Sequence, residues 1–263
     1  MSIKTISQAE WKLYLKRLSR ISEKAVEEFQ SYVAANLGWG NIPRKKLIDA
    51  AYAISTKYGE ASAALSATAY DAVSVAQGAM VEAAVPALPA SYKQVAKTVN
   101  GILKNTESEE VLAQSVGLLA KAAGQKTTIQ NAMRDGAEIA YIPQGDTCAY
   151  CLALASEGWS KASTKDLDLD GEPAHLHANC DCTYGIRFNG SLKYAGYDPQ
   201  KYYDMYHDPP GLREGEKPTA KNRINAMRRE FYAENKDKIN EQKRDAYEKR
   251  KERESSTAEE YKV

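Results

Sequence analysis

The sequence lacks both an excess of charge of one sign and a long apolar run. It has 36 basic and 35 acidic residues among 263, which gives a formal net charge of +1. A chain with so little net charge has no global field that would attract nucleic acid or an anionic membrane. No stretch approaches the roughly 18 apolar residues that a membrane span needs, and residues 1–10 are polar, unlike a signal peptide. We therefore expect a soluble protein, made in the cytoplasm, that has no membrane partner.

The recognisable catalytic motifs are also absent. The chain contains no H-x-E upstream of a P-C-x-x-C, no H-E-x-x-H, no G-x-S-x-G and no phosphate-binding glycine loop. We therefore expect no enzymatic activity. A zinc-dependent nuclease remains an alternative, because His175, His177 and Asn179 lie close to cysteines. Its second metal-binding histidine could only be His207, in a tyrosine-rich segment where we expect no clear helix.

Cysteine is missing from most of the chain, and all four cysteines lie between residues 148 and 182. Clustered cysteines in a cytoplasmic chain favour a metal over a disulfide framework, although a disulfide stays open if the protein matures outside a reducing cell. A tetrahedral shell of thiolates and imidazole is typical of structural zinc, and a full shell leaves no place for water. Five residues compete for the four positions: Cys148, Cys151, His177, Cys180 and Cys182. Which of Cys180 and Cys182 binds the metal is left open.

Helical periodicity dominates residues 1–140, which we interpret as a helical domain of long amphipathic helices. Ser7 and Glu10 form a capping-box pattern at the start of the first helix, which should end near Gly38. Pro43 can open a second, alanine-rich helix, and prolines 86 and 89 then break the chain. Three shorter helices are expected to follow, at Tyr92–Leu103, Glu109–Ala123 and Thr127–Ala140.

The remaining chain divides into two further parts. Residues 141–189 are predicted to form a small α+β zinc-binding module, with a strand at residues 183–188 directly after the last cysteine. Residues 190–263 begin with tyrosines and continue as a charged helical tail at about residues 219–254. The fold class we expect is therefore mainly α.

The charge of the tail decides between two interpretations. Residues 190–263 hold 17 basic and 15 acidic side chains, so a solvated or partner-bound helix is favoured over a DNA-binding arm. DNA binding stays an alternative, and it would depend on the following basic residues: Arg228, Arg229, Lys243, Arg244, Lys249, Arg250 and Lys251.

The spacing of the Cys/His cluster resembles the signature of the MuF-type phage head morphogenesis proteins, also called minor head or minor capsid proteins. The resemblance is carried by Asp146-x-Cys148-x-x-Cys151 and, about 25 residues later, His177-x-Asn179-Cys180-x-Cys182. In that family the second half usually reads His-Pro-x-Cys-Arg-Cys, whereas this chain has Ala178 and Asp181 at the proline and arginine positions. The match spans about residues 90–190.

The resemblance implies a minor structural protein of a tailed-phage head that acts by contact in head assembly, DNA packaging or DNA ejection. It would lie in the capsid interior or portal region of the virion, and in the host cytoplasm during assembly. Its implied partners are the portal protein, the major capsid protein or both, with DNA as a further candidate, and a homo-oligomer is compatible with this role. A DNA-binding zinc protein and a zinc-dependent nuclease are the alternatives.

Overall fold

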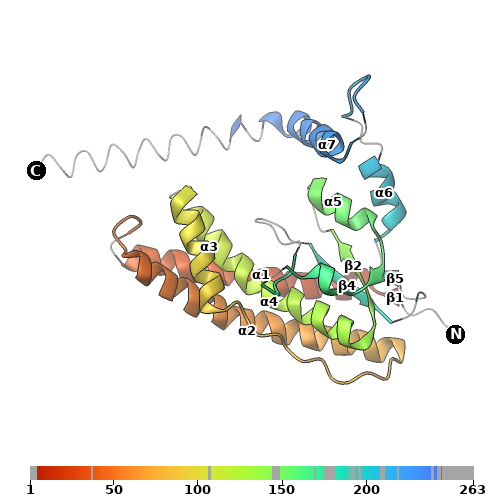
Figure 1. Ribbon diagram of the computed structural model, residues 1–263, viewed down its shortest axis with the longest axis horizontal. Coiled ribbons are helices and arrows are strands. Elements are labelled where there is room, and N and C mark those ends of the chain that lie inside the picture. The colour runs from red at the N-terminus through yellow and green to blue at the C-terminus, as the bar shows by residue number, and fades with distance from the viewer. Residues whose placement is uncertain are drawn as a thin grey trace, which may run out of the picture. The chain divides into compact units, whose positions relative to one another are not determined.

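The computed structural model describes a mainly helical protein, as the sequence predicts (Figure 1). The description covers residues 5–36, 38–105, 108–143, 149–168, 170–174, 182–188, 190, 193–194, 197–207, 211–217, 219–237, 240–241 and 244. Two compact units are present: Met1–Asp146 with Glu157–Pro199, and Thr147–Ser156 with Gln200–Val263. The division at residues 140 and 189 stays a prediction. Within the described part of the chain, no helix is both long enough and apolar enough to cross a membrane.

The first two helices of the first unit begin and end close to where the sequence predicts. Helix α1 (Gln8–Ala35) starts with the expected capping box, in which Ser7 Oγ accepts a hydrogen bond from Glu10 N at 3.2 Å. Helix α2 (Arg44–Gln77) follows Pro43 and ends at Gly78, whose φ of 66° lies in the left-handed region that glycine tolerates. Helix α3 (Tyr92–Asn105) matches the predicted third helix.

The prediction of separate helices at 109–123 and 127–140 is wrong. A single helix, α4 (Glu109–Asp135), runs through the predicted gap, and the chain after Gly136 is a strand. Helix α4 packs against both α1 and α2 (Figure 1).

Two glycines of α4 are sites of close helix packing and not helix ends. A Cβ atom on Gly124 would lie 2.5 Å from Ser62 Oγ and 2.7 Å from Ser66 Oγ, both on α2. A Cβ on Gly117 would lie 2.9 Å from Ser22 Oγ on α1. Real Cβ atoms do not approach other atoms this closely, so α4 reaches its neighbours only because these positions have no side chain.

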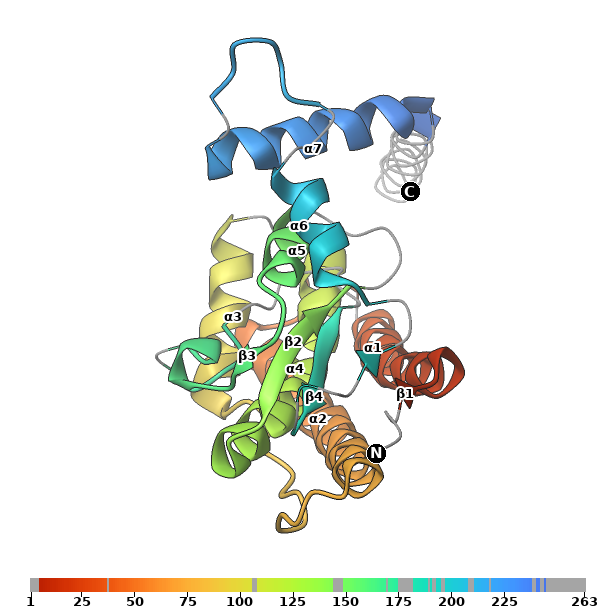
Figure 2. The same ribbon diagram turned by 90° about the vertical axis from the view of Figure 1, so that its right-hand side faces the viewer.

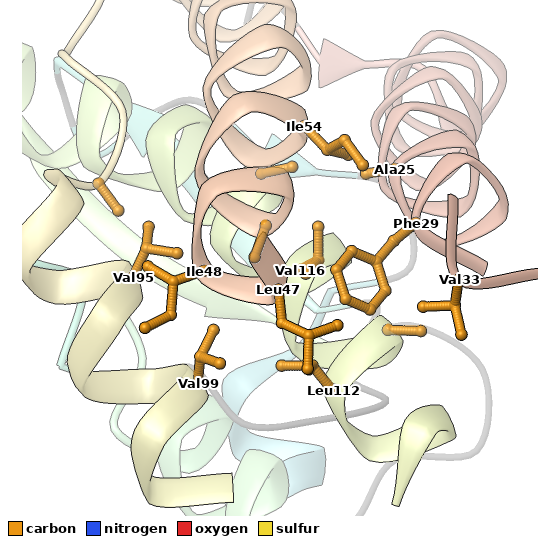
Figure 3. Packing of buried hydrophobic residues seen from close by; sticks show 14 of the residues in the cluster. Ala25, Phe29, Val33, Leu47, Ile48, Ile54, Val95, Val99, Leu112 and Val116 are labelled. Atoms are coloured by element: carbon orange, nitrogen blue, oxygen red, sulfur yellow. The ribbon is translucent and has the colours of Figure 1, made fainter. Parts of the chain in front are cut away.

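The hydrophobic core of the first unit lies where α1, α2, α3 and α4 meet (Figure 3). Each helix contributes buried side chains. The main contributors are Phe29 and Val33 from α1, Leu47, Ile48 and Ile54 from α2, Val95 and Val99 from α3, and Leu112 and Val116 from α4.

A small antiparallel sheet packs against α4 (Figure 2). Its central strand β2 (Glu138–Ile142) pairs with β3 (Ser160–Lys161) on one side and with β4 (Thr183–Arg187) on the other. Strand β4 confirms the predicted strand after the last cysteine. Two short strands, β1 (Thr5–Ile6) and β5 (Lys193–Tyr194), pair in parallel elsewhere in this unit, and a 3-10 turn occupies Thr164–Asp166.

The second unit contains α5 (Ala149–Ser156), most of α6 (Pro199–His207) and α7 (Ala220–Glu234). The expectation of no clear helix around His207 is wrong, because that residue ends α6. Helix α7 begins where the tail helix was predicted, with Thr219 Oγ1 accepting from Asn222 N at 3.2 Å. Residues 245–254 of the predicted tail helix lie outside the described residues.

The close packing at Gly124 predicts the effect of adding one methyl group. Gly124→Ala should lower the free energy of unfolding by about 1–3 kcal/mol, because overpacking outweighs the better helix propensity of alanine. Gly101→Ala on α3 is the control, since a Cβ there meets no atom within 4 Å, and it should be neutral or stabilising by up to about 1 kcal/mol. Urea unfolding of both variants tests this, and equal effects would contradict the packing role of Gly124.

Candidate metal centre

Two of the five predicted zinc ligands lie within the described residues. Cys151 is on α5 and is 1% exposed, and Cys182 directly precedes β4 and is 3% exposed. Cys148, His177 and Cys180 lie outside the described residues, as do His175 and Asn179. Among the described residues, no group of three or more His, Cys, Asp or Glu side chains is arranged to hold a metal ion. The zinc site therefore stays a prediction.

Helix α4 holds both ends of the segment that carries His177 and Cys180. On the C-terminal side, Gln125 Nε2 donates a buried hydrogen bond to the carbonyl oxygen of Cys182 at 3.1 Å. On the N-terminal side, Lys126 Nζ lies 2.9 Å from Glu172 Oε1, and both side chains are about 15% exposed. Two adjacent residues of one helix thus bind Glu172 and Cys182, the described residues on either side of the segment that carries His177 and Cys180.

The acidic run before this segment forms a closed turn and not an open cation site. Asp166 Oδ2 accepts from Ser163 N at 2.8 Å, and Asp168 Oδ1 accepts from two backbone amides of its own turn, those of residues 170 and 172, at 2.9 Å. Lys97 Nζ donates to Asp170 Oδ2 at 2.8 Å, which holds the pKa of that carboxyl below its ordinary value. Each of these carboxylates already has a partner within the fold.

His207, the remaining histidine of the nuclease alternative, packs among aromatic rings. Its ring stacks on Tyr203 with centroids 3.9 Å apart and meets the edge of Tyr206 at 5.3 Å. This stacking gives the His207 ring a packing role on α6.

The sequence predicts only a helix break at the α2–α3 connection (residues 78–91). It does not reveal that side chains of neighbouring helices bind the backbone of this connection. Asn131 on α4 accepts a hydrogen bond from Val85 N and donates one to Val85 O, both at 2.9 Å. One turn earlier, Thr127 Oγ1 accepts from Ala87 N at 2.9 Å. These side chains pair with the connection's backbone as a neighbouring strand would.

The first part of the connection is held in the same way. Asp71 Oδ1 on α2 accepts from Ala84 N at 2.8 Å. The guanidinium of Arg134 donates to the carbonyl oxygens of residues 82 and 83, at 2.8 and 3.1 Å. Positions 127, 131 and 134 follow an i, i+4, i+7 spacing, so this polar stripe on α4 was a signal available in the sequence.

The same connection turns three large apolar side chains to solvent. Met80 is fully exposed, Val85 is 64% exposed and Leu88 is 81% exposed. Exposed apolar side chains on a hydrogen-bonded backbone can be covered by a partner at a small cost in conformational entropy. We call these three residues the apolar ridge.

Comparison of the sequence with known families indicates a phage protein. Residues 5–209, from β1 to just beyond α6, match the VG15 protein family, and the chain belongs to that family. The match covers the helical unit, the sheet and the cysteine segment, and it stops before α7. No curated protein and no solved structure matches the chain.

The two lysines that bind the acidic turn make a matched pair for mutation. Lys126→Met should lower the free energy of unfolding by about 1–3 kcal/mol, because it leaves the mostly buried Glu172 carboxylate without its cation. Lys97→Met removes an ion pair whose side chains are 76% and 47% exposed, and it should cost less than about 1 kcal/mol. Urea unfolding distinguishes them, and a larger loss in Lys97→Met would contradict α4 as the anchor of this segment.

Proposed function

We propose that this protein is a minor structural protein of a tailed-phage head that acts by contact near the portal, in head assembly, DNA packaging or DNA ejection. Its partners would be the portal protein, the major capsid protein or both, and its place the capsid interior or portal region of the virion. Membership of a phage protein family supports the general setting, and the spacing of the Cys/His cluster supports the narrower role. A protein of this kind needs no catalytic centre, and we propose that it acts without one.

The observation that carries the contact role is the apolar ridge. Exposed apolar side chains on a fixed backbone lose little conformational entropy when a partner covers them, so more of the binding energy is retained. Asp71, Thr127, Asn131 and Arg134 hold the backbone of residues 82, 84, 85 and 87, between Met80 and Leu88, in the absence of a partner.

We also propose that zinc is a structural staple of the cysteine segment. The thiols of Cys151 and Cys182 are buried, which fits ligands of a closed structural site better than those of a solvent-exposed catalytic one. Cys148, His177 and Cys180 would supply the remaining positions, with one of the five left out of the shell. Bound zinc would supply a cross-link between segments far apart in the sequence and no reactive water.

The head-protein proposal is tested by the composition of phage particles. Mass spectrometry should find the protein at low copy number in purified virions and procapsids. Leu88→Glu should reduce its incorporation about tenfold or more, because a charge would be buried in the contact. Leu13→Glu on α1, at a residue that is 50% exposed, is the matched control and should leave incorporation unchanged.

Absence of the wild-type chain from both kinds of particle would overturn the head-protein role. Equal incorporation of the two glutamate variants would overturn the role of the ridge alone.

The zinc proposal predicts a metal content and a local response to its removal. Protein purified without oxygen should carry about one zinc per chain. Chelation should increase amide hydrogen exchange in residues 141–189 while α1 to α4, which share their own core, keep their protection. Metal-free protein with a disulfide between Cys148 and Cys182, or between Cys151 and Cys180, would contradict the proposal. Uniform loss of helical signal would contradict a local staple.

A further inference from the structure

Helix α7 carries its exposed cations on one face. At about 100° per residue, positions 221, 225, 228 and 232 fall within about 60° of one another, whereas Arg223, Glu230 and Glu234 lie on about the opposite side. This face therefore carries Lys221, Asn225, Arg228 and Tyr232, in that order along the helix. All four side chains are at least partly exposed.

Lys236 extends this face beyond the end of the helix. It lines one shallow surface hollow together with Asn225, Arg228 and Tyr232. We call Lys221, Arg228 and Lys236 the α7 cations. All three are exposed, and none forms an ion pair with an acidic side chain of the described residues.

Two other arginines of α7 are used to fix the helix. Arg229 donates to the carbonyl oxygen of Gly211 at 3.0 Å and pairs with Glu216 at 2.6 Å. Arg223 lies over the ring of Tyr206, 5.7 Å from its centroid. The α7 cations are thus presented by a helix whose orientation within its own unit is set by other residues.

We propose that the α7 cations bind duplex DNA through its phosphate backbone, without sequence specificity. Lys221 and Arg228 are two helical turns apart, about 11 Å, so they can reach different phosphates along one strand. An acidic protein segment would need matching carboxylates at this spacing, whereas DNA supplies phosphates at every 3.4 Å or so of each strand. Tyr232 adds a hydroxyl donor and Asn225 adds an amide donor, and both kinds of donor commonly contact phosphate oxygens.

This inference stands apart from the family and from the proposed head role. Helix α7 lies beyond the matched residues 5–209, and neither zinc nor the apolar ridge enters the argument. It also refines the interpretation of the tail as a mixed-charge surface, because the exposed cations of α7 share one face of the helix.

The experiment measures binding of the full chain to a labelled 20-base-pair duplex by fluorescence anisotropy at 25 to 200 mM salt. In a plot of the logarithm of the binding constant against the logarithm of salt concentration, three phosphate contacts should contribute about −2.7 to the slope. The triple variant Lys221→Gln, Arg228→Gln, Lys236→Gln should bind at least tenfold more weakly at low salt and show a slope shallower by about that amount.

The control variant also removes two lysines and one arginine, but from an exposed surface on α1. Lys12→Gln, Lys16→Gln, Arg17→Gln on α1 makes an equal change in net charge, and these side chains are exposed. It should bind DNA with nearly wild-type affinity and slope. Circular dichroism should show that both variants keep their helices.

Three outcomes would overturn the proposal. The first is no DNA binding by the wild-type chain even at 25 mM salt. The second is an equal loss of affinity in the two triple variants, which would indicate net charge and not the α7 face. The third is displacement of DNA by polyglutamate at equal charge concentration, which would indicate an acidic protein partner for this face.

Discussion

The arrangement of the first unit depends on how closely α4 approaches α1 and α2. Ordinary helix packing keeps axes 8–10 Å apart because side chains fill the space between them. Gly117 and Gly124 place no side chain in that space, and the hydroxyls of Ser22, Ser62 and Ser66 lie within 2.9 Å of the positions that a Cβ atom would occupy. Ser22 Oγ also donates to Gly117 O at 3.0 Å, so the approach satisfies a polar group as well as filling space.

Because α4 is fixed in this way, the polar residues that follow Gly124 become reliable anchors. Gln125 and Lys126 hold the two ends of the segment with His177 and Cys180. Thr127 and Asn131, on the next turns, hold the α2–α3 connection. A helix with a freer position could make such hydrogen bonds only at the further cost of ordering itself. The same helix therefore binds both Glu172 and Cys182 and the backbone of the α2–α3 connection.

Sequence reasoning succeeded where local chemistry decides the structure. The capping box at Ser7, the helix start after Pro43 and the strand after Cys182 each follow from neighbouring residues, and the structure confirms them. It failed at residues 124–140, where it placed a break at residues 124–126 and continued a helix to residue 140, whereas α4 runs unbroken to Asp135 and a strand follows. At Gly124 tertiary contact with α2 decides the conformation, and that contact leaves no trace in the local pattern.

The same distinction applies to the candidate site. The spacing of the cysteines and His177 could be recognised from the sequence because ligands of one metal recur at short, regular intervals. The anchors Gln125 and Lys126 could not, since they are bound to residues more than 40 positions away. Helix α6 was missed because nine residues rich in tyrosine carry too little periodicity to distinguish a helix from a loop.

The α2–α3 connection shows why a segment without regular structure can serve as a contact surface. An extended chain on a protein surface has amides and carbonyls that either bind water or invite pairing with another strand. Here side chains of α2 and α4 occupy many of those groups, including both polar groups of Val85. In the proposed contact role, a partner would therefore meet the side chains of Met80, Val85 and Leu88 and not an open backbone edge. Binding at this surface would depend on the shape and apolar area of a specific partner, which limits non-specific strand pairing.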